Sequence, residues 1–410
     1  MTGGRPPVAL YLHVPFCVSL CPYCDFVVYS GSAARGPANR IARFVEALLV
    51  ELRLRADLQD AAHGPPGPAR PPLASVYLGG GTPSLLAAGQ VGALLRLIEQ
   101  RFGLAADAEV TLEANPGGDE LGDLAGFRAA GVTRLSLGAQ SLQADELRRL
   151  GRRHRPADVG RAVERARGAG LRSVSLDLLY DVPGQTVESW SGTLDAAMAL
   201  APDHLSAYAL TLDDPDAEGL TGPLGDHLPV RAGARHWRTA ARAAQDADRA
   251  AELYERLDER MAAAGLPWYE VSNFAPPGER SRHNLAYWRR LPYEAVGPGA
   301  HAFDGGRLRR WNAARLDGYL GALLPASGAP PRLPPGGREV LDEATVTVEE
   351  AMLGLRLADG LAPSVAARAA VAPTIAWGRE QGLVADGPAG HAVLTRRGRL
   401  LSNELFARLL

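Results

Sequence analysis

Residues 10–26 read LYLHVPFCVSLCPYCDF, and this stretch joins a strand-like segment to a loop that holds every cysteine of the chain. Cys17, Cys21 and Cys24 lie within eight residues, in a C-x3-C-x2-C spacing. Disulfide frameworks of small secreted proteins instead use an even number of cysteines spread along the chain. The spacing therefore predicts a metal site in a loop directly after the first strand.

Thiolates at this spacing can surround one corner of a 4Fe-4S cluster, because iron–sulfur clusters favour soft cysteine ligands. Three protein ligands for four irons leave one iron open to a small molecule. Zinc is an alternative, held by the three cysteines and a nearby histidine such as His13, although zinc ligands usually come as two separated pairs. A second alternative is three unliganded cysteines, but free cysteines are usually buried and scattered, whereas here all three lie in one loop.

Short apolar runs alternate with helical patterns along the chain. Strands are predicted over residues 8–15, 75–83, 109–116, 134–140, 173–183 and 204–212, and helices over 41–52, 119–130, 142–150, 157–169 and 186–200. This alternation is typical of parallel strands joined by crossover helices, and six such units curve into a barrel or partial barrel. We therefore expect an α/β fold with a partial (β/α)6 TIM-like barrel, whose active site collects at the C-terminal ends of the strands.

Two Pro/Gly-rich stretches interrupt the pattern. Residues 63–72 are expected to form a surface loop, whereas residues 323–338 are expected to be a linker between two domains. The first domain would span 1–322. The second would span 339–410, where a helical segment, a short hairpin and a further helix resemble a small winged-helix module.

Charge and hydropathy exclude several classes of protein. The formal net charge is -2 for 410 residues, so no strong attraction to nucleic acid or anionic lipid is expected. The N-terminal residues lack the features of a signal peptide, and no apolar run is long enough to cross a membrane. The sequence predicts a cytoplasmic protein that is not an integral membrane protein.

Seven motifs in register make a family resemblance specific. Besides the cysteine loop they are GGGTP (79–83), EANP (113–116), GAQS (138–141), LGRRH (150–154), SLDLLYDVPGQT (175–186) and HNLAYW (283–288). In this order they resemble the coproporphyrinogen-dehydrogenase-like group of radical S-adenosylmethionine (SAM) proteins. The resemblance implies a 4Fe-4S cluster on the three cysteines, with SAM bound at its open iron.

The resemblance also implies a set of cofactor-binding residues: Tyr11, Tyr23, Phe26, Gly80, Gly81, Thr82, Glu113, Gln140, Arg152 and Asp177. The glycines would bring backbone close to SAM and offer free N–H groups, since residues without a Cβ allow such an approach. Glu113 would accept a hydrogen bond from SAM. Asp177 lies in a strand that otherwise reads as buried, so its carboxylate needs a partner, and Arg152 is a plausible one.

Two departures from the dehydrogenase itself narrow the resemblance. That enzyme carries a fourth cysteine two residues after the third, where this sequence has Phe26, and a long segment before the cluster, where only 16 residues precede Cys17. Both features resemble instead the HemW group of haem chaperones, which carries the HN-x2-YW motif. That motif makes His283 a candidate axial haem ligand with aromatic neighbours for the porphyrin. The alternative is that His283 and Trp288 close the end of the barrel, and His301 is a second candidate ligand.

Three functions follow from these patterns. The first is a haem chaperone that binds haem, a 4Fe-4S cluster and SAM and passes haem to membrane-bound respiratory haem proteins, whether or not it turns over SAM as an enzyme. The second is oxygen-independent coproporphyrinogen III dehydrogenase, which generates a 5'-deoxyadenosyl radical. The third is a radical SAM nucleic-acid modifier, but the C-terminal segment lacks the aromatic ladder and concentrated charge that such a reader needs.

Overall fold

The computed structural model describes residues 4–35, 39–326 and 328–410. Its first half consists of alternating strands and crossover helices, with two helices between β4 and β5: β1 (Ala9–Val14), α1 (Ile41–His63), β2 (Leu73–Gly80), α2 (Ala88–Phe102), β3 (Leu104–Ala114), α3 (Leu124–Ala130), β4 (Arg134–Gln140), α4 (Ala144–Arg149), α5 (Pro156–Gly168), β5 (Ser173–Tyr180), α6 (Val187–Ala199) and β6 (His204–Ala209). Neighbouring strands from β1 to β6 are parallel. The predicted α/β fold with a partial (β/α)6 barrel is confirmed.

The sequence reasoning missed α2 and assigned no elements between β6 and the proline-rich stretch. That region holds α7 (Ala232–Ala243), α8 (Ala247–Ala263), β7 (Trp268–Glu270), β8 (Asn273–Phe274), α9 (Arg282–Trp288), β9 (Tyr293–Val296), β10 (His301–Phe303), β11 (Leu308–Asn312) and α10 (Leu316–Leu323). These strands widen the sheet on both sides. Its order is β12-β11-β10-β9-β1-β2-β3-β4-β5-β6-β8-β7, with β12 (Gly336–Val340) at one edge, so the last residues of the expected linker pair with β11.

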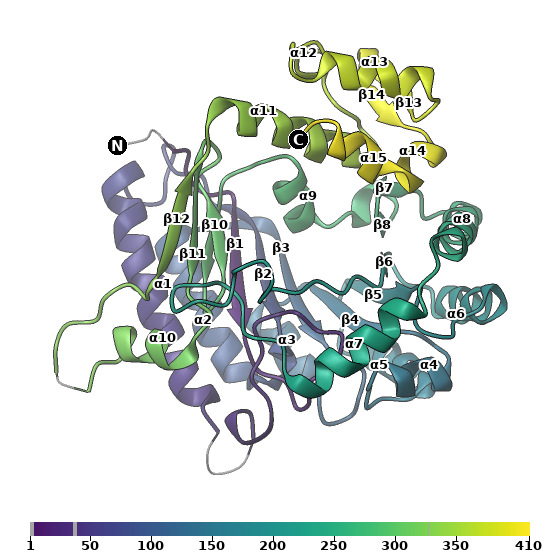
Figure 1. The fold of residues 1–410 in the computed structure, drawn as a ribbon. Coiled ribbons are helices and arrows are strands. Elements are labelled where there is room, and N and C mark those ends of the chain that lie inside the picture. The colour runs from purple at the N-terminus through teal and green to yellow at the C-terminus, as the bar shows by residue number, and fades with distance from the viewer. Residues whose placement is uncertain (1–3, 36–38, 327) are drawn as a thin grey trace.

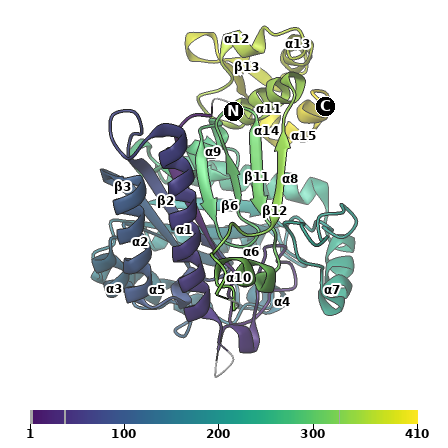
Figure 2. The ribbon, with the colours of Figure 1, turned by 90° about the vertical axis from the view of Figure 1, so that its left-hand side faces the viewer.

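The C-terminal elements are α11 (Glu343–Arg356), α12 (Pro363–Ala366), α13 (Ala372–Glu380), the hairpin β13 (Val384–Asp386) and β14 (Ala392–Leu394), α14 (Arg396–Leu400) and α15 (Ser402–Ala407). They enclose an apolar core of their own, which includes Leu355, Ile375, Leu394 and Leu405. Figure 1 shows these elements, green at α11 and yellow beyond it, gathered at one end of the molecule, above α9, while α7 and α10 lie toward the other end. The side view agrees (Figure 2).

Strand β1 shows how the sequence builds both faces of the sheet. Side chains alternate across a strand, so Leu10, Leu12 and Val14 point one way and Tyr11 and His13 the other. The three aliphatic side chains are fully buried in the main core, which the outer helices share. Tyr11 and His13 therefore face the interior of the barrel, beneath the cysteine loop.

The C-terminal module covers the N-terminal ends of the barrel strands, here called the floor. The Arg356 guanidinium lies 3.0 Å from the Glu270 carboxylate, which is completely buried, and 4.3 Å above the ring centre of Trp288. The Ala358 N–H donates to the Tyr269 carbonyl at 2.9 Å. The opposite end, where the strands finish, is here called the mouth.

Candidate functional site

The cysteine loop follows β1 at the mouth and is held from a distant helix. Arg238 of α7 donates to the backbone carbonyls of Pro22 (3.2 Å), Tyr23 (3.0 Å) and Cys24 (2.9 Å). The guanidinium is almost entirely buried, which strengthens these charge-assisted bonds. The loop is thus pre-shaped by a residue that the sequence reasoning missed, because no motif surrounds Arg238.

Four of the sequence motifs converge on the sulfur atoms. Thr82 Oγ1 lies 3.4 Å from Cys17 Sγ and accepts from Asn115 Nδ2 at 3.1 Å. Arg152 Nη1 lies 3.5 Å from Cys21 Sγ, and its Nη2 donates to the Gly138 carbonyl at 2.8 Å. Thr82, Asn115 and Gly138 lie at the ends of barrel strands, and Arg152 follows α4 and reaches back to the same end, which is why motifs far apart in sequence meet here.

The chemistry of this donor set fits a 4Fe-4S cluster. Burial raises the pKa of the Cys17 thiol to about 12 and that of Cys24 still further, so without a metal these groups stay protonated. Thiolates bound to iron would bring negative charge into the same space. Arg152 supplies the matching cation, and its buried Nε has no hydrogen-bond partner among the described residues. Hydrogen bonds of this kind to cluster sulfurs tune the metal centre.

His13, the expected fourth ligand of a zinc site, is not available for zinc in this geometry. His13 Nε2 lies 2.8 Å from the Val27 carbonyl, which can only accept, so this nitrogen carries the proton. Nδ1 then accepts from the Tyr11 hydroxyl at 3.0 Å. Both nitrogens of His13 are therefore engaged away from the cysteines.

The glycine motif works differently from the expectation of free N–H groups. The Gly80 N–H donates to Glu113 Oε2 (3.0 Å), the Gly81 N–H to the Val14 carbonyl (2.9 Å) and the Thr82 N–H to the Phe16 carbonyl (2.7 Å). All three donors are already used, so that expectation was wrong.

The glycines are needed because β1 and the strand that follows it lie very close at the mouth. A Cβ on Gly81 would come within 2.6 Å of the Phe16 carbonyl oxygen, and one on Gly80 within 2.5 Å of the His13 ring. Gly80 also has a φ of +108°. The motif thus sets the path of the chain into the cysteine loop.

Glu113 stands inside the barrel, below the glycine motif. Its carboxylate accepts from the Tyr77 hydroxyl at 2.7 Å as well as from the Gly80 N–H. Burial raises the pKa of Glu113 to about 7. The side chain can therefore hold or release a proton near neutral pH, a property suited to a polar ligand at the mouth.

Asp177 does not pair with Arg152. Its carboxylate accepts from the Ser136 hydroxyl at 2.8 and 3.0 Å and from Ser175 at 3.4 Å. Burial raises the pKa of Asp177, and the hydroxyl hydrogen bonds oppose that rise. The expected ion pair was wrong because Arg152 extends toward Cys21 instead.

Three further predicted residues lie around the same end of the barrel. Tyr23 packs against Trp237 of α7, with ring centres 6.3 Å apart. Gln140 ends β4 with a φ of +64°, and its amide nitrogen would lie 3.0 Å from a Cβ on Gly138. Phe26, directly after the cysteine loop, is 63% exposed and lines a cavity. The structure thus brings the predicted cofactor residues together at or below the mouth.

His283 lies below these residues, in the floor, with its ring centre 6.4 Å from that of Tyr11, and its partner Tyr287 lines the same cavity as Phe26. It is only 1% exposed, its Nδ1 lies 3.0 Å from the Ser75 hydroxyl and its Nε2 lies 2.8 Å from the Tyr287 hydroxyl. Burial lowers the pKa of His283 to about 3, so the ring is neutral. These are the contacts of a residue that closes the barrel end, and they leave neither nitrogen open to a haem iron.

Comparison with known proteins gives the family. Residues 11–197 match the model of the radical SAM superfamily. The heme chaperone HemW of Mycobacterium tuberculosis (strain H37Rv) is 38% identical over 408 residues, which cover 98% of this chain and 95% of that protein. The chain belongs to the HemW family. The HemW protein of Escherichia coli K12 is 38% identical over 76% of this chain and 74% of its own length.

A solved structure supports the fold of this HemW-family chain. Coproporphyrinogen III oxidase (HemN) from E. coli, described as a radical SAM enzyme, matches with a TM-score of 0.75 over 99% of this chain and 90% of that chain. The two sequences are 22% identical, so this likeness shows a shared fold alone. Among the described residues, no helix is long and apolar enough to cross a bilayer.

Proposed function

We propose that this chain is a cytoplasmic haem chaperone that binds haem beside a 4Fe-4S cluster and SAM, and that delivers haem to membrane-bound respiratory haem proteins. One observation carries the proposal. The residues that directly follow the cysteine loop, Phe26 and Val27, form a wall of a cavity of about 300 Å³ that is also lined by His13, His227 and His301. This cavity supports the proposal because it places an exposed phenyl ring and three histidines directly beside the cysteine loop.

Phe26 favours a haem-binding protein over an enzyme that decarboxylates a porphyrinogen. An exposed phenyl ring offers an apolar face to a porphyrin, whereas cysteine at this position is the pattern of the dehydrogenase. The cluster with SAM, when bound, supplies one-electron chemistry. The chain's own residues hold the loop through Arg238, place Arg152 and Thr82 at the sulfurs, and keep an ionisable carboxyl, Glu113, inside the barrel.

The test is a haem titration of protein whose cluster has been reconstituted without oxygen, followed by difference absorbance against the same protein without haem. We expect saturation at one haem per chain. Absence of haem binding by the parent protein would contradict the proposal.

The same samples, given SAM and a reductant, are assayed for 5'-deoxyadenosine and for decarboxylation of coproporphyrinogen III. The proposal predicts no decarboxylation under conditions in which a known dehydrogenase is active. Decarboxylation would make the chain the dehydrogenase instead.

A further inference from the structure

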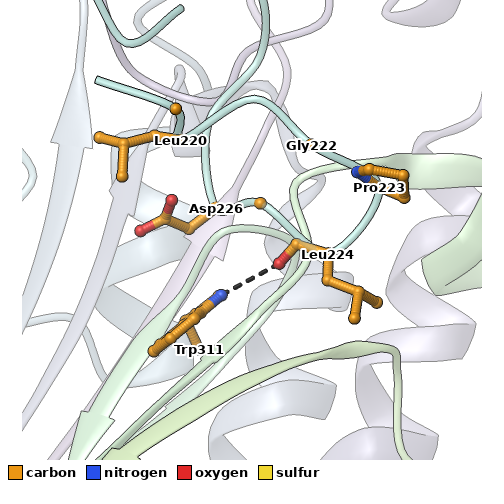
Figure 3. A pocket seen from close by; sticks show the side chains of 8 residues that line it. Leu220, Gly222, Pro223, Leu224, Asp226 and Trp311 are labelled. Atoms are coloured by element: carbon orange, nitrogen blue, oxygen red, sulfur yellow. Dashed lines mark hydrogen bonds between the residues drawn. The ribbon is translucent and has the colours of Figure 1, made fainter.

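A second cavity adjoins the one beside Phe26. It measures about 490 Å³ and lies between the 219–226 segment and β11, with Leu220, Pro223, Leu224 and Trp311 among its walls (Figure 3). Trp311 Nε1 donates to the Leu224 carbonyl at 3.0 Å and so ties the segment to the sheet. Asp226 lines both cavities, and each volume falls in or near the range of about 300–1,000 Å³ typical of small-molecule sites.

Asp226 holds two histidines at this junction. Its Oδ1 lies 3.0 Å from His227 Nδ1 and its Oδ2 lies 2.7 Å from His301 Nε2. Burial opposes ionisation, but the hydrogen bonds from His227 and His301 hold the pKa of Asp226 well below its usual range. The carboxylate is thus ionised and able to orient both imidazole rings.

The two rings are not equivalent. His227 uses Nδ1 for Asp226, and its Nε2 has no hydrogen-bond partner among the described residues. A histidine whose Nδ1–H is held by a carboxylate while Nε2 stays free is the common arrangement of a metal ligand. His301 uses Nε2 instead, and its ring stacks on Trp311 with centres 6.0 Å apart and planes 22° apart.

Exposed apolar side chains line both cavities. Leu224 is 56% exposed and Phe26 is 63% exposed, in a protein whose large apolar side chains are mostly buried. Exposed apolar groups beside a cavity mark ligand or partner sites, and haem has two broad apolar faces. Phe26 offers such a face a surface in the cavity that His227 lines, whereas Leu224 and Trp311 line the adjoining cavity, and Asp226 lines both.

We propose that His227 Nε2 is an axial ligand of the bound haem, with the porphyrin lying against Phe26 in the cavity that both residues line. The inference rests on the proposed haem-binding function and assigns the ligand to this loop instead of to His283. Ligation forms one bond, from the Nε2 lone pair to iron. The proton on Nδ1 stays in the hydrogen bond to Asp226, and no redox change is required.

The experiment compares haem titrations of cluster-loaded parent protein with those of His227→Ala, Asp226→Asn and His283→Ala. Loss of a carboxylate partner behind a ligating histidine typically weakens metal binding by about 10–100-fold, so we expect a loss of this size for Asp226→Asn and at least as large for His227→Ala. Added imidazole should restore the absorbance of the ligated haem in His227→Ala. His236→Ala, an exposed histidine in α7, is the matched control and should bind as the parent does.

The outcomes separate the two proposals. If the parent binds no haem, the proposed function fails. If the parent binds haem and His227→Ala binds it with the same affinity and spectrum, the function stands and the assignment of His227 is overturned. A loss confined to His283→Ala, with circular dichroism showing that the variant is folded, would also overturn it in favour of the floor histidine.

Discussion

The two ends of the barrel use histidine in opposite ways. In the floor, His283 is buried between Ser75 and Tyr287, and both ring nitrogens have partners. Near the mouth, Asp226 orients His227 and His301 at the surface of a cavity, and one nitrogen of His227 stays open. The comparison teaches that a histidine in a distinctive motif can serve packing, while one without a motif can have the geometry of a ligand.

The largest expected effect lies at the mouth. Replacing Cys17, Cys21 and Cys24 together by alanine should abolish cluster absorbance and bound sulfide after anaerobic reconstitution, because no other cysteine exists in the chain. The thermal midpoint of the protein without cluster should change little, since Arg238 holds the backbone of the loop and not its thiols. Ser19→Ala, in the same loop, is the control. Cluster formation by the triple variant would place the iron elsewhere.

At the floor, the largest expected effect is on stability. Glu270→Ala should lower the free energy of unfolding by about 3 kcal/mol, because it leaves the Arg356 guanidinium without its buried carboxylate and removes the acceptor of the Ser272 N–H. Urea denaturation measures the change. Glu259→Ala, which breaks an exposed pair with Arg396, should cost at most about 1 kcal/mol. Equal losses in the two variants would mean that the floor pair is no more important than a surface pair.

A smaller effect is expected for His283→Ala. The change leaves the buried Ser75 and Tyr287 hydroxyls without their partner and should cost about 1–3 kcal/mol in the free energy of unfolding. The unfolding midpoint in urea reports it, with His236→Ala as the reference. Unchanged stability would contradict a structural role for His283 in the floor.

The smallest expected effect is a difference in pH dependence between the two ends. The pKa of His283 is lowered to about 3 by burial, so the unfolded chain binds the extra proton and stability falls as the pH drops below about 6.5. The pKa of Glu113 is raised to about 7, also by burial, so the folded chain binds the extra proton and stability falls as the pH rises from about 4.5 to 7.

Urea unfolding between pH 5 and 7 should therefore show a shallower rise with pH in His283→Gln than in the parent, and a steeper rise in Glu113→Gln. Each difference is on the order of 1 kcal/mol. If stability depended on pH in the same way in the parent and both variants, the shifted pKa values of His283 and Glu113 would be contradicted.

Local patterns predicted the cluster loop and the six parallel strands, since spacing and short-range hydropathy carry that information. The apolar spacing of α2 was also present, at Val91, Leu94, Leu95 and Ile98, and was overlooked. The strands β7 to β11 have only two to five residues, too few for a period to stand out.

The sequence could not predict the contacts that depend on long-range packing. Arg238 reaches the cysteine loop, and Asp226 reaches His301, only because the segment between β6 and α8 folds back over the mouth. Arg152 lies beside the cysteine loop but has a different partner from the one expected, because its neighbour depends on side-chain direction and not on strand order. The resemblance of HNLAYW to a family motif identified these residues but did not predict at which end of the barrel they lie.

The position of Arg238 behind the cysteine loop also bears on the reduction potential of the cluster. Two buried guanidinium groups, Arg238 behind the backbone of the loop and Arg152 at Cys21, would place positive charge beside a cluster held by the three cysteines. Reduction adds an electron, so nearby cations stabilise the reduced form and raise the reduction potential. Replacing Arg152 by glutamine would keep a donor near the sulfur and remove the charge. The cluster of that variant would be harder to reduce, and a redox titration would measure how much of the driving force for electron uptake the protein itself supplies.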